Sequence, residues 1–138
     1  MALRAETRAR ARALQLLYAW ESDGRPGLEE LLPRVERLTR ATPPVQAHAA
    51  ELARGVVAEC ERLDGLFAGA VEHWRLDRLA VIDRNILRLA VFEMVHDRVR
   101  PKTAIDEALW LAHRFGGVQS APFINGVLDH VARTLGRL

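Results

Sequence analysis

The stretch LAVIDRNILRLAVFEMVH, residues 79–96, decides how the chain folds. Its apolar residues recur at the three- and four-residue spacings of a helix: Ile82, Ile86, Leu89, Ala90 and Phe92. A helix that is apolar on most of its sides lies in the interior of a protein. The stretch therefore predicts a central helix, which ends before the Val99-Arg100-Pro101 sequence because proline does not fit a helix interior.

The segments on both sides of this stretch also have helical periodicity, and none alternates as a strand does. We expect a first helix from about Leu3 to Ser22 and a short second one with leucines between residues 28 and 38, whose start Pro33 shifts to a later position. A long helical stretch is expected from about Val45 to Trp74, after an N-cap at Thr42.

Two further helices are expected after Pro101. Thr103 and Asp106 resemble a capping box that opens the first of them, and Gly116 is expected to close it in the left-handed conformation. Ser120 is expected to cap the last helix. The sequence thus predicts an all-α fold, a single-domain helical bundle of about six to seven helices over residues 1–138. If the chain forms two small helical subdomains, their joint is expected near residues 74–79.

Composition narrows the classes of function. The chain has 138 residues, a net charge of +2, 49% hydrophobic residues and 28% charged residues, which is ordinary for a soluble globular domain. Its one cysteine, Cys60, excludes an internal disulfide and a cysteine-based zinc site. Neither a signal-peptide core nor an apolar run of about 18 residues is present, so we expect a cytoplasmic protein without a membrane partner.

The motifs of common enzymes are missing. The five histidines are scattered singly, no glycine-rich loop precedes a helix, and neither serine lies in a nucleophile elbow. Acidic pairs occur where helices begin, where the helix dipole favours carboxylates. We therefore expect no enzyme, no catalytic residue, no metal site and no cofactor.

The N-terminal helix carries an unusual run of arginines in RARARALQLLYAW, residues 8–20. At 100° per residue, Arg4, Arg8 and Arg12 form one stripe. Arg10 lies about 200° from Arg8, within the arc of Leu14. Positive charges at a helix N-terminus oppose the macrodipole, so this end either projects into water or approaches a polyanion such as RNA. The basic residues of a second cluster follow the central stretch: Arg98, Arg100, Lys102 and Arg114.

Three segments together resemble the bacterial NusB family of transcription antitermination factors: RARALQLLYAWE at residues 10–21, DRNILRLAVFEM at 83–94, and PKTAIDEALWLAHRFGGVQSAPFINGVLDHVA at 101–132. The last is the most specific, through AIxEAxxLAxxFG followed by FxNGVLD. The resemblance implies the family's all-helical fold and a role in processive antitermination. It implies binding to boxA RNA of nascent ribosomal RNA leaders together with NusE, a small-subunit ribosomal protein, and assembly with other Nus factors and RNA polymerase.

The resemblance also assigns residues. Those implied to bind RNA are Arg4, Arg8, Arg10, Arg12, Tyr18, Lys102, Phe115, Gln119 and Phe123. Asp83 and Tyr18 are implied to meet NusE, where the charge of Asp83 would pair with basic residues. Glu6 and Thr7 interrupt the family's arginine run, and Gln119 replaces an acidic residue of some relatives.

Two alternatives remain open at this point. One is a NusB-like RNA-binding domain related to the N-terminal region of ribosomal RNA methyltransferases. The other is a homodimeric scaffold whose arginine face is hidden between subunits.

Overall fold

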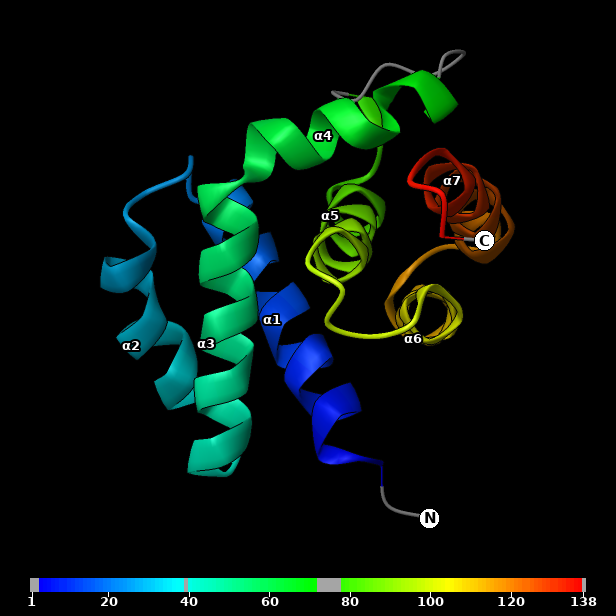
Figure 1. Cartoon of the computed structure of the whole chain (residues 1–138). Helices are drawn as coiled ribbons and strands as arrows, with labels where there is room; N and C mark the ends of the chain where they lie inside the picture. Colours follow the sequence, from blue (N-terminus) through cyan, green and yellow to red (C-terminus); the bar gives the residue numbers. More distant parts are fainter. Residues whose placement is uncertain (1–2, 39, 72–77, 138) are drawn as a thin grey trace. The chain divides into compact units, whose positions relative to one another are not determined.

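The computed structural model describes residues 3–38, 40–71 and 78–137, and their regular secondary structure is entirely helical (Figure 1). These ranges hold seven α-helices and one short 3-10 helix, so the predicted all-α class is confirmed. The chain divides into two compact units, residues 1–58 and 59–138. The sequence suggested a joint near residues 74–79, of which 74–77 lie outside the described residues. No helix within the described ranges has both the length and the apolar character needed to cross a membrane.

The first unit contains three helices that lie side by side: α1 (Ala5–Ser22), α2 (Leu28–Leu38) and α3 (Pro43–Ala58) (Figure 1). The main packing joins α1 to α3. The buried faces of these two helices are rich in alanine: Ala9, Ala13, Ala49, Ala50 and Ala53. Small side chains let two helix backbones approach closely, and the larger Leu17 and Leu52 fill the remaining space.

The second helix differs from the sequence prediction. It begins at Leu28 and continues through Pro33, although proline removes one backbone hydrogen bond. Burial of Leu28, Leu31 and Leu32 offsets this cost.

An exposed ion pair also ties α2 to α3. The Arg54 guanidinium donates two hydrogen bonds to the Glu29 carboxylate, at 2.5 Å and 3.1 Å. These bonds hold the pKa of Glu29 below its ordinary value.

The second unit consists of α4 (Cys60–Ala68), the 3-10 helix η1 (Gly69–Val71), α5 (Val81–Val95), α6 (Pro101–Phe115) and α7 (Ser120–Thr134). Every residue from Asn85 to Met94 in α5 is buried, and α5 packs against α4, α6 and α7. The prediction of a central helix is thus confirmed.

Charged groups lie inside this unit as well. Arg88 of α5 is buried, and its guanidinium donates to both carboxylate oxygens of Asp64 at 2.7 Å and 2.9 Å. It also donates to Oδ1 of Asn85 at 2.9 Å. A buried guanidinium needs such partners because it cannot be hydrated. The pair therefore fixes α4 against α5.

Two helix boundaries were predicted wrongly. The expected continuous helix from Val45 breaks at Glu59, whose φ of −114° and ψ of 19° separate α3 from α4; Trp74 lies outside the described residues. The expected capping box does not form because α6 begins two residues before Thr103, with Pro101 in its first turn and Arg100 as N-cap. Proline fits the first turn of a helix because the backbone amides of that turn make no intrahelical hydrogen bond, so the missing N–H costs nothing.

Candidate nucleic-acid interface

The N-terminal turns of α1 expose part of the predicted arginine group. Arg4 is the N-cap residue, in an extended conformation with φ −65° and ψ 152°, and its carbonyl accepts the Arg8 amide at 3.1 Å. Arg4 and Arg8 are both exposed, one helical turn apart. Among the described residues, the Arg8 side chain has no hydrogen-bond or ion-pair partner. This side chain is therefore available to an external anion.

The other two arginines of the group are engaged by the fold. Arg10 is only 4% exposed, on the side of α1 that also buries Leu14. Arg12 is half-buried and donates to the Gln15 side chain at 2.9 Å and to the Arg40 carbonyl at 3.3 Å. The spacing of 100° per residue correctly predicted that Arg10 and Arg8 lie on different sides of α1. An RNA contact by Arg10 stays a prediction, but its burial favours a role in packing.

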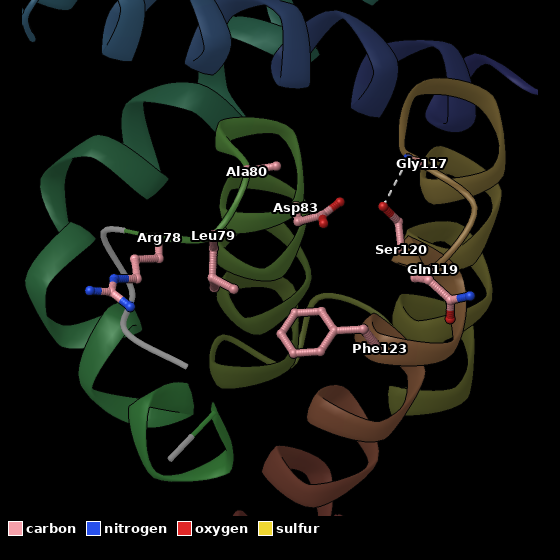
Figure 2. A pocket seen from close by; sticks show the side chains of 8 residues that line it. All are labelled: Arg78, Leu79, Ala80, Asp83, Gly117, Gln119, Ser120 and Phe123. Carbon is pink, nitrogen blue, oxygen red and sulfur yellow. Dashed lines mark hydrogen bonds between the residues drawn. The ribbon is translucent and has the colours of Figure 1, made fainter. Parts of the chain in front are cut away.

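A pocket of about 310 Å³ opens in the second unit, between the beginning of α5 and the beginning of α7 (Figure 2). Its lining comes from the segment entering α5, from the loop after α6 and from the first turn of α7: Arg78, Leu79, Ala80, Asp83, Gly117, Gln119, Ser120 and Phe123. Three of these, Asp83, Gln119 and Phe123, are residues that the family resemblance singled out. The resemblance assigned Gln119 and Phe123 to RNA and Asp83 to NusE, but all three line the same pocket.

Asp83 gives the pocket its most unusual chemical feature. It lies in the first turn of α5, where the helix dipole favours a carboxylate. Its Oδ1 is buried and has no hydrogen-bond partner among the residues that the structure describes. Leaving a charged acceptor unsatisfied costs free energy. A donor group that enters the pocket would remove this cost, so the pocket is suited to an amino, amide or guanidinium group beside Asp83.

Phe123 provides an apolar wall. Figure 2 shows its ring pointing toward Leu79, near Asp83 and Ser120. Arg84 donates to the Leu79 carbonyl at 3.1 Å and so holds the segment that enters α5. A flat, half-buried ring in the lining of a pocket is the kind of surface on which a nucleobase stacks.

The loop between α6 and α7 has a geometry that the sequence did not predict. Gly116 has φ −91° and ψ −175°, an extended conformation and not the expected left-handed one. Glycine is needed for space, because a Cβ would lie 2.7 Å from Ser120 Cβ and 2.8 Å from the Ala112 carbonyl oxygen. Ser120 is the first residue of α7, with Gln119 as N-cap, and its Oγ accepts the Gly117 amide at 2.9 Å. The predicted cap at Ser120 was therefore wrong by one position.

The remaining predicted residues lie elsewhere. Tyr18, on α1, is 47% exposed, and Lys102 is exposed in the first turn of α6. Phe115 is half-buried at the end of α6, edge-on to Trp110, with the Arg114 guanidinium 5.7 Å from its ring centre. None of these three lines the pocket.

Sequence reasoning missed Arg78, Leu79 and Ser120 as lining residues. The first two precede α5 without any motif, and Ser120 was interpreted only as a helix cap. Their place in the pocket follows from the way α5 and α7 pack together, which local patterns do not reveal.

Comparison with known proteins gives a consistent result. The NusB family model matches residues 7–133. The Transcription antitermination protein NusB of Solibacter usitatus is 39% identical over 129 residues, covering 93% of this chain and 88% of that protein. The protein of the same name from Anaeromyxobacter sp. is 42% identical over 133 residues, covering 94% of this chain and 90% of its own length.

Solved structures that are similar to this chain also include NusB proteins. T. maritima NusB is similar with a TM-score of 0.83 and 30% identity, covering 96% of this chain and 93% of that one. A chain in the crystal structure of antitermination factors NusB and NusE in complex with dsRNA has a TM-score of 0.82 and 26% identity, covering 96% of this chain and 99% of its own.

Proposed function

The chain belongs to the NusB family, and from this premise we propose that it is a transcription antitermination factor that binds boxA RNA together with NusE. It acts on nascent ribosomal RNA leaders, with other Nus factors and RNA polymerase, and keeps transcription processive. The family match over residues 7–133 carries this proposal. We also propose that the protein works in the cytoplasm and has no catalytic activity.

The exposed arginines of α1 support the RNA-binding part. Arg8 and Arg4 are positioned to contact phosphates, and a guanidinium can donate two parallel hydrogen bonds to a phosphate. Arg12 has only a partly exposed side chain for the same purpose.

The pocket supports the pairing of RNA with a protein partner. We propose that a base stacks on Phe123, with the Gln119 amide available for hydrogen bonds to base edges. The Asp83 carboxylate repels phosphate and attracts cations, so we propose that it receives a basic side chain of NusE. When one partner is already bound, the other loses less entropy on binding, and this couples the two affinities.

A filter-binding titration tests the proposal. The parent protein should bind boxA RNA more tightly than a scrambled RNA of equal length, and NusE should raise the affinity for boxA RNA. Equal binding of the two RNAs, with and without NusE, would contradict the proposed function.

Two variants separate the roles within the pocket. Phe123→Leu keeps an apolar side chain but removes the ring, and should weaken RNA binding by about tenfold or more, as loss of stacking does. Asp83→Lys should impair capture of NusE while RNA binding in the absence of NusE changes little. The matched control is Arg37→Glu, a charge reversal at an exposed residue of α2. An unchanged NusE affinity in Asp83→Lys would remove Asp83 from the partner interface.

A further inference from the structure

The second unit has a strongly basic surface at the end opposite the pocket. The helices α6 and α7 are adjacent and joined by residues 116–119, so the beginning of α6 lies beside the end of α7 (Figure 1). Asp97, just after α5, accepts a hydrogen bond from Arg137 at 2.6 Å, which ties the C-terminal segment to this end. We define the distal basic surface by its four cations: Arg98, Arg100, Lys102 and Arg137.

Charge is concentrated on this surface. Residues 96–102 and 135–137 contain these four cations and one carboxylate, Asp97, a net charge of +3 where the whole chain carries +2. Arg137 uses the carboxylate, and the Arg98 guanidinium lies 5.7 Å from the Phe92 ring centre. Arg100 and Lys102 are exposed, and in the part of the chain that the structure describes their side chains have no hydrogen bond or ion pair.

The position of these two cations is unfavourable for the fold alone. Arg100 and Lys102 flank the start of α6, a helix of 15 residues with no acidic residue in its first turn and no side-chain cap. Positive charges at a helix N-terminus oppose the macrodipole, whereas an anion there is favoured. A bound anion would therefore compensate both cations and the helix end.

The surface fits phosphate better than a protein partner. Protein interfaces are anchored by apolar and aromatic side chains. Within the described residues, the large apolar side chains that are exposed are Leu3, Tyr18, Leu38 and Val118, and none belongs to this surface. Arginines without an apolar anchor are typical of contacts to a nucleic-acid backbone.

We propose that the distal basic surface binds the phosphate backbone of RNA beyond the segment held at the pocket. This inference rests on the proposed function and adds a second contact to it. The helix α5 begins at the pocket and ends at this surface, and its 15 residues span about 22 Å. At about 3.4 Å per phosphate along a stacked strand, the RNA needs about seven nucleotides to reach from one site to the other.

The test compares a minimal boxA RNA with the same RNA extended by about ten nucleotides on each side, enough to cover that span. The extended RNA should bind the parent protein more tightly. Two phosphate contacts on a single strand predict a gain that falls roughly sevenfold as salt rises from about 50 to about 200 mM.

The variant Arg100→Asp, which leaves Lys102 in place, should reduce this gain, lower its salt dependence from about sevenfold to about threefold, and keep the affinity for the minimal RNA. Asp is a preferred N-cap, so the same variant should be at least as stable as the parent, which separates lost binding from misfolding. The matched control reverses one exposed charge on α2, Arg37→Glu, and should retain the gain.

Different results would contradict the proposed function and the proposed RNA contact of the distal basic surface. A parent that does not bind minimal boxA RNA contradicts the proposed function. A parent that binds it but gains nothing from the extension, or a distal variant that keeps the gain, overturns this inference alone. Competition by poly-glutamate with no effect of the RNA extension would assign the surface to an acidic protein and also overturn it.

Discussion

Replacing Gly116 by alanine should destabilise the protein, because the space beside this glycine is already filled. An added Cβ would lie 2.7 Å from Cβ and Oγ of Ser120 and 2.8 Å from the Ala112 carbonyl oxygen. Carbon atoms in good contact lie about 3.5–4.0 Å apart, so the overlap with Ser120 is about 1 Å. The φ of −91° suits alanine as well as glycine, so backbone strain is not the cause.

The loss of stability in Gly116→Ala depends on how far the neighbouring groups can move. Overpacking of this kind costs about 1–3 kcal/mol. The clash cannot be relieved freely, because the Gly116 amide donates to the Ala112 carbonyl at 2.8 Å and Ser120 accepts the Gly117 amide at 2.9 Å. Alanine also lowers the entropy of the unfolded chain, which returns about 0.4–1 kcal/mol. We expect a net loss of about 1 kcal/mol in the free energy of unfolding.

Gly126 is the matched control. It lies inside α7, and a Cβ there would meet nothing within 4 Å. Gly126→Ala should therefore stabilise the fold by about 0.5–1 kcal/mol. Urea unfolding followed by far-UV circular dichroism measures both variants. If Gly116→Ala is as stable as the parent, or if both variants shift stability in the same direction, the steric reasoning is wrong.

Three further predictions concern charges. Asp64→Ala leaves the buried Arg88 guanidinium without its carboxylate and should cost about 3 kcal/mol in urea unfolding; a loss below about 1 kcal/mol would contradict this. Arg8→Ala should leave stability unchanged, weaken boxA RNA binding by about 1 kcal/mol and flatten the salt slope by about 0.7; full affinity at low salt would exclude Arg8 as a contact. The lowered pKa of Glu29 means that its pair with Arg54 stabilises the fold above the pKa of the unfolded carboxyl group, and that this contribution fades as pH falls through the folded value. The Tm difference between the parent and Glu29→Gln should therefore be present at neutral pH and vanish in acid; a difference that grows in acid would refute the assignment.

The fold could be predicted from the sequence because helical periodicity and burial agree in it. A helix as apolar as α5 is buried on all sides only at the centre of a helical unit. In the structure every residue from Asn85 to Met94 is buried. Chain breaks depend on finer energies. No glycine or proline marks Glu59, so nothing local distinguishes the break between α3 and α4 from a continuous helix.

The predicted N-caps failed for a related reason. Thr103 and Ser120 are residue types that commonly begin helices, and each was assigned that role from local sequence. Gly116 does end α6 as predicted, but in an extended conformation and not in the left-handed one. In the structure, Pro101 begins α6 earlier, and the contact between Gly116 and Ser120 fixes the loop through space. Local chemistry identified the residues that matter at these boundaries, while packing decided what each of them does.

The candidate site shows the same division between what residues suggest and what packing decides. The family resemblance gave Gln119 and Phe123 to RNA and Asp83 to NusE, but a pocket of about 310 Å³ brings all three together. This volume lies at the lower end of the range for ligand pockets, so a base and a partner side chain that both enter it lie close together. If both bind as proposed, the base stacks on Phe123 and the partner's group satisfies the unpaired Oδ1 of Asp83. RNA binding and NusE binding at this pocket are then coupled by shared space as well as by charge, and Asp83→Asn should alter the effect of NusE on RNA affinity more than it alters RNA affinity itself.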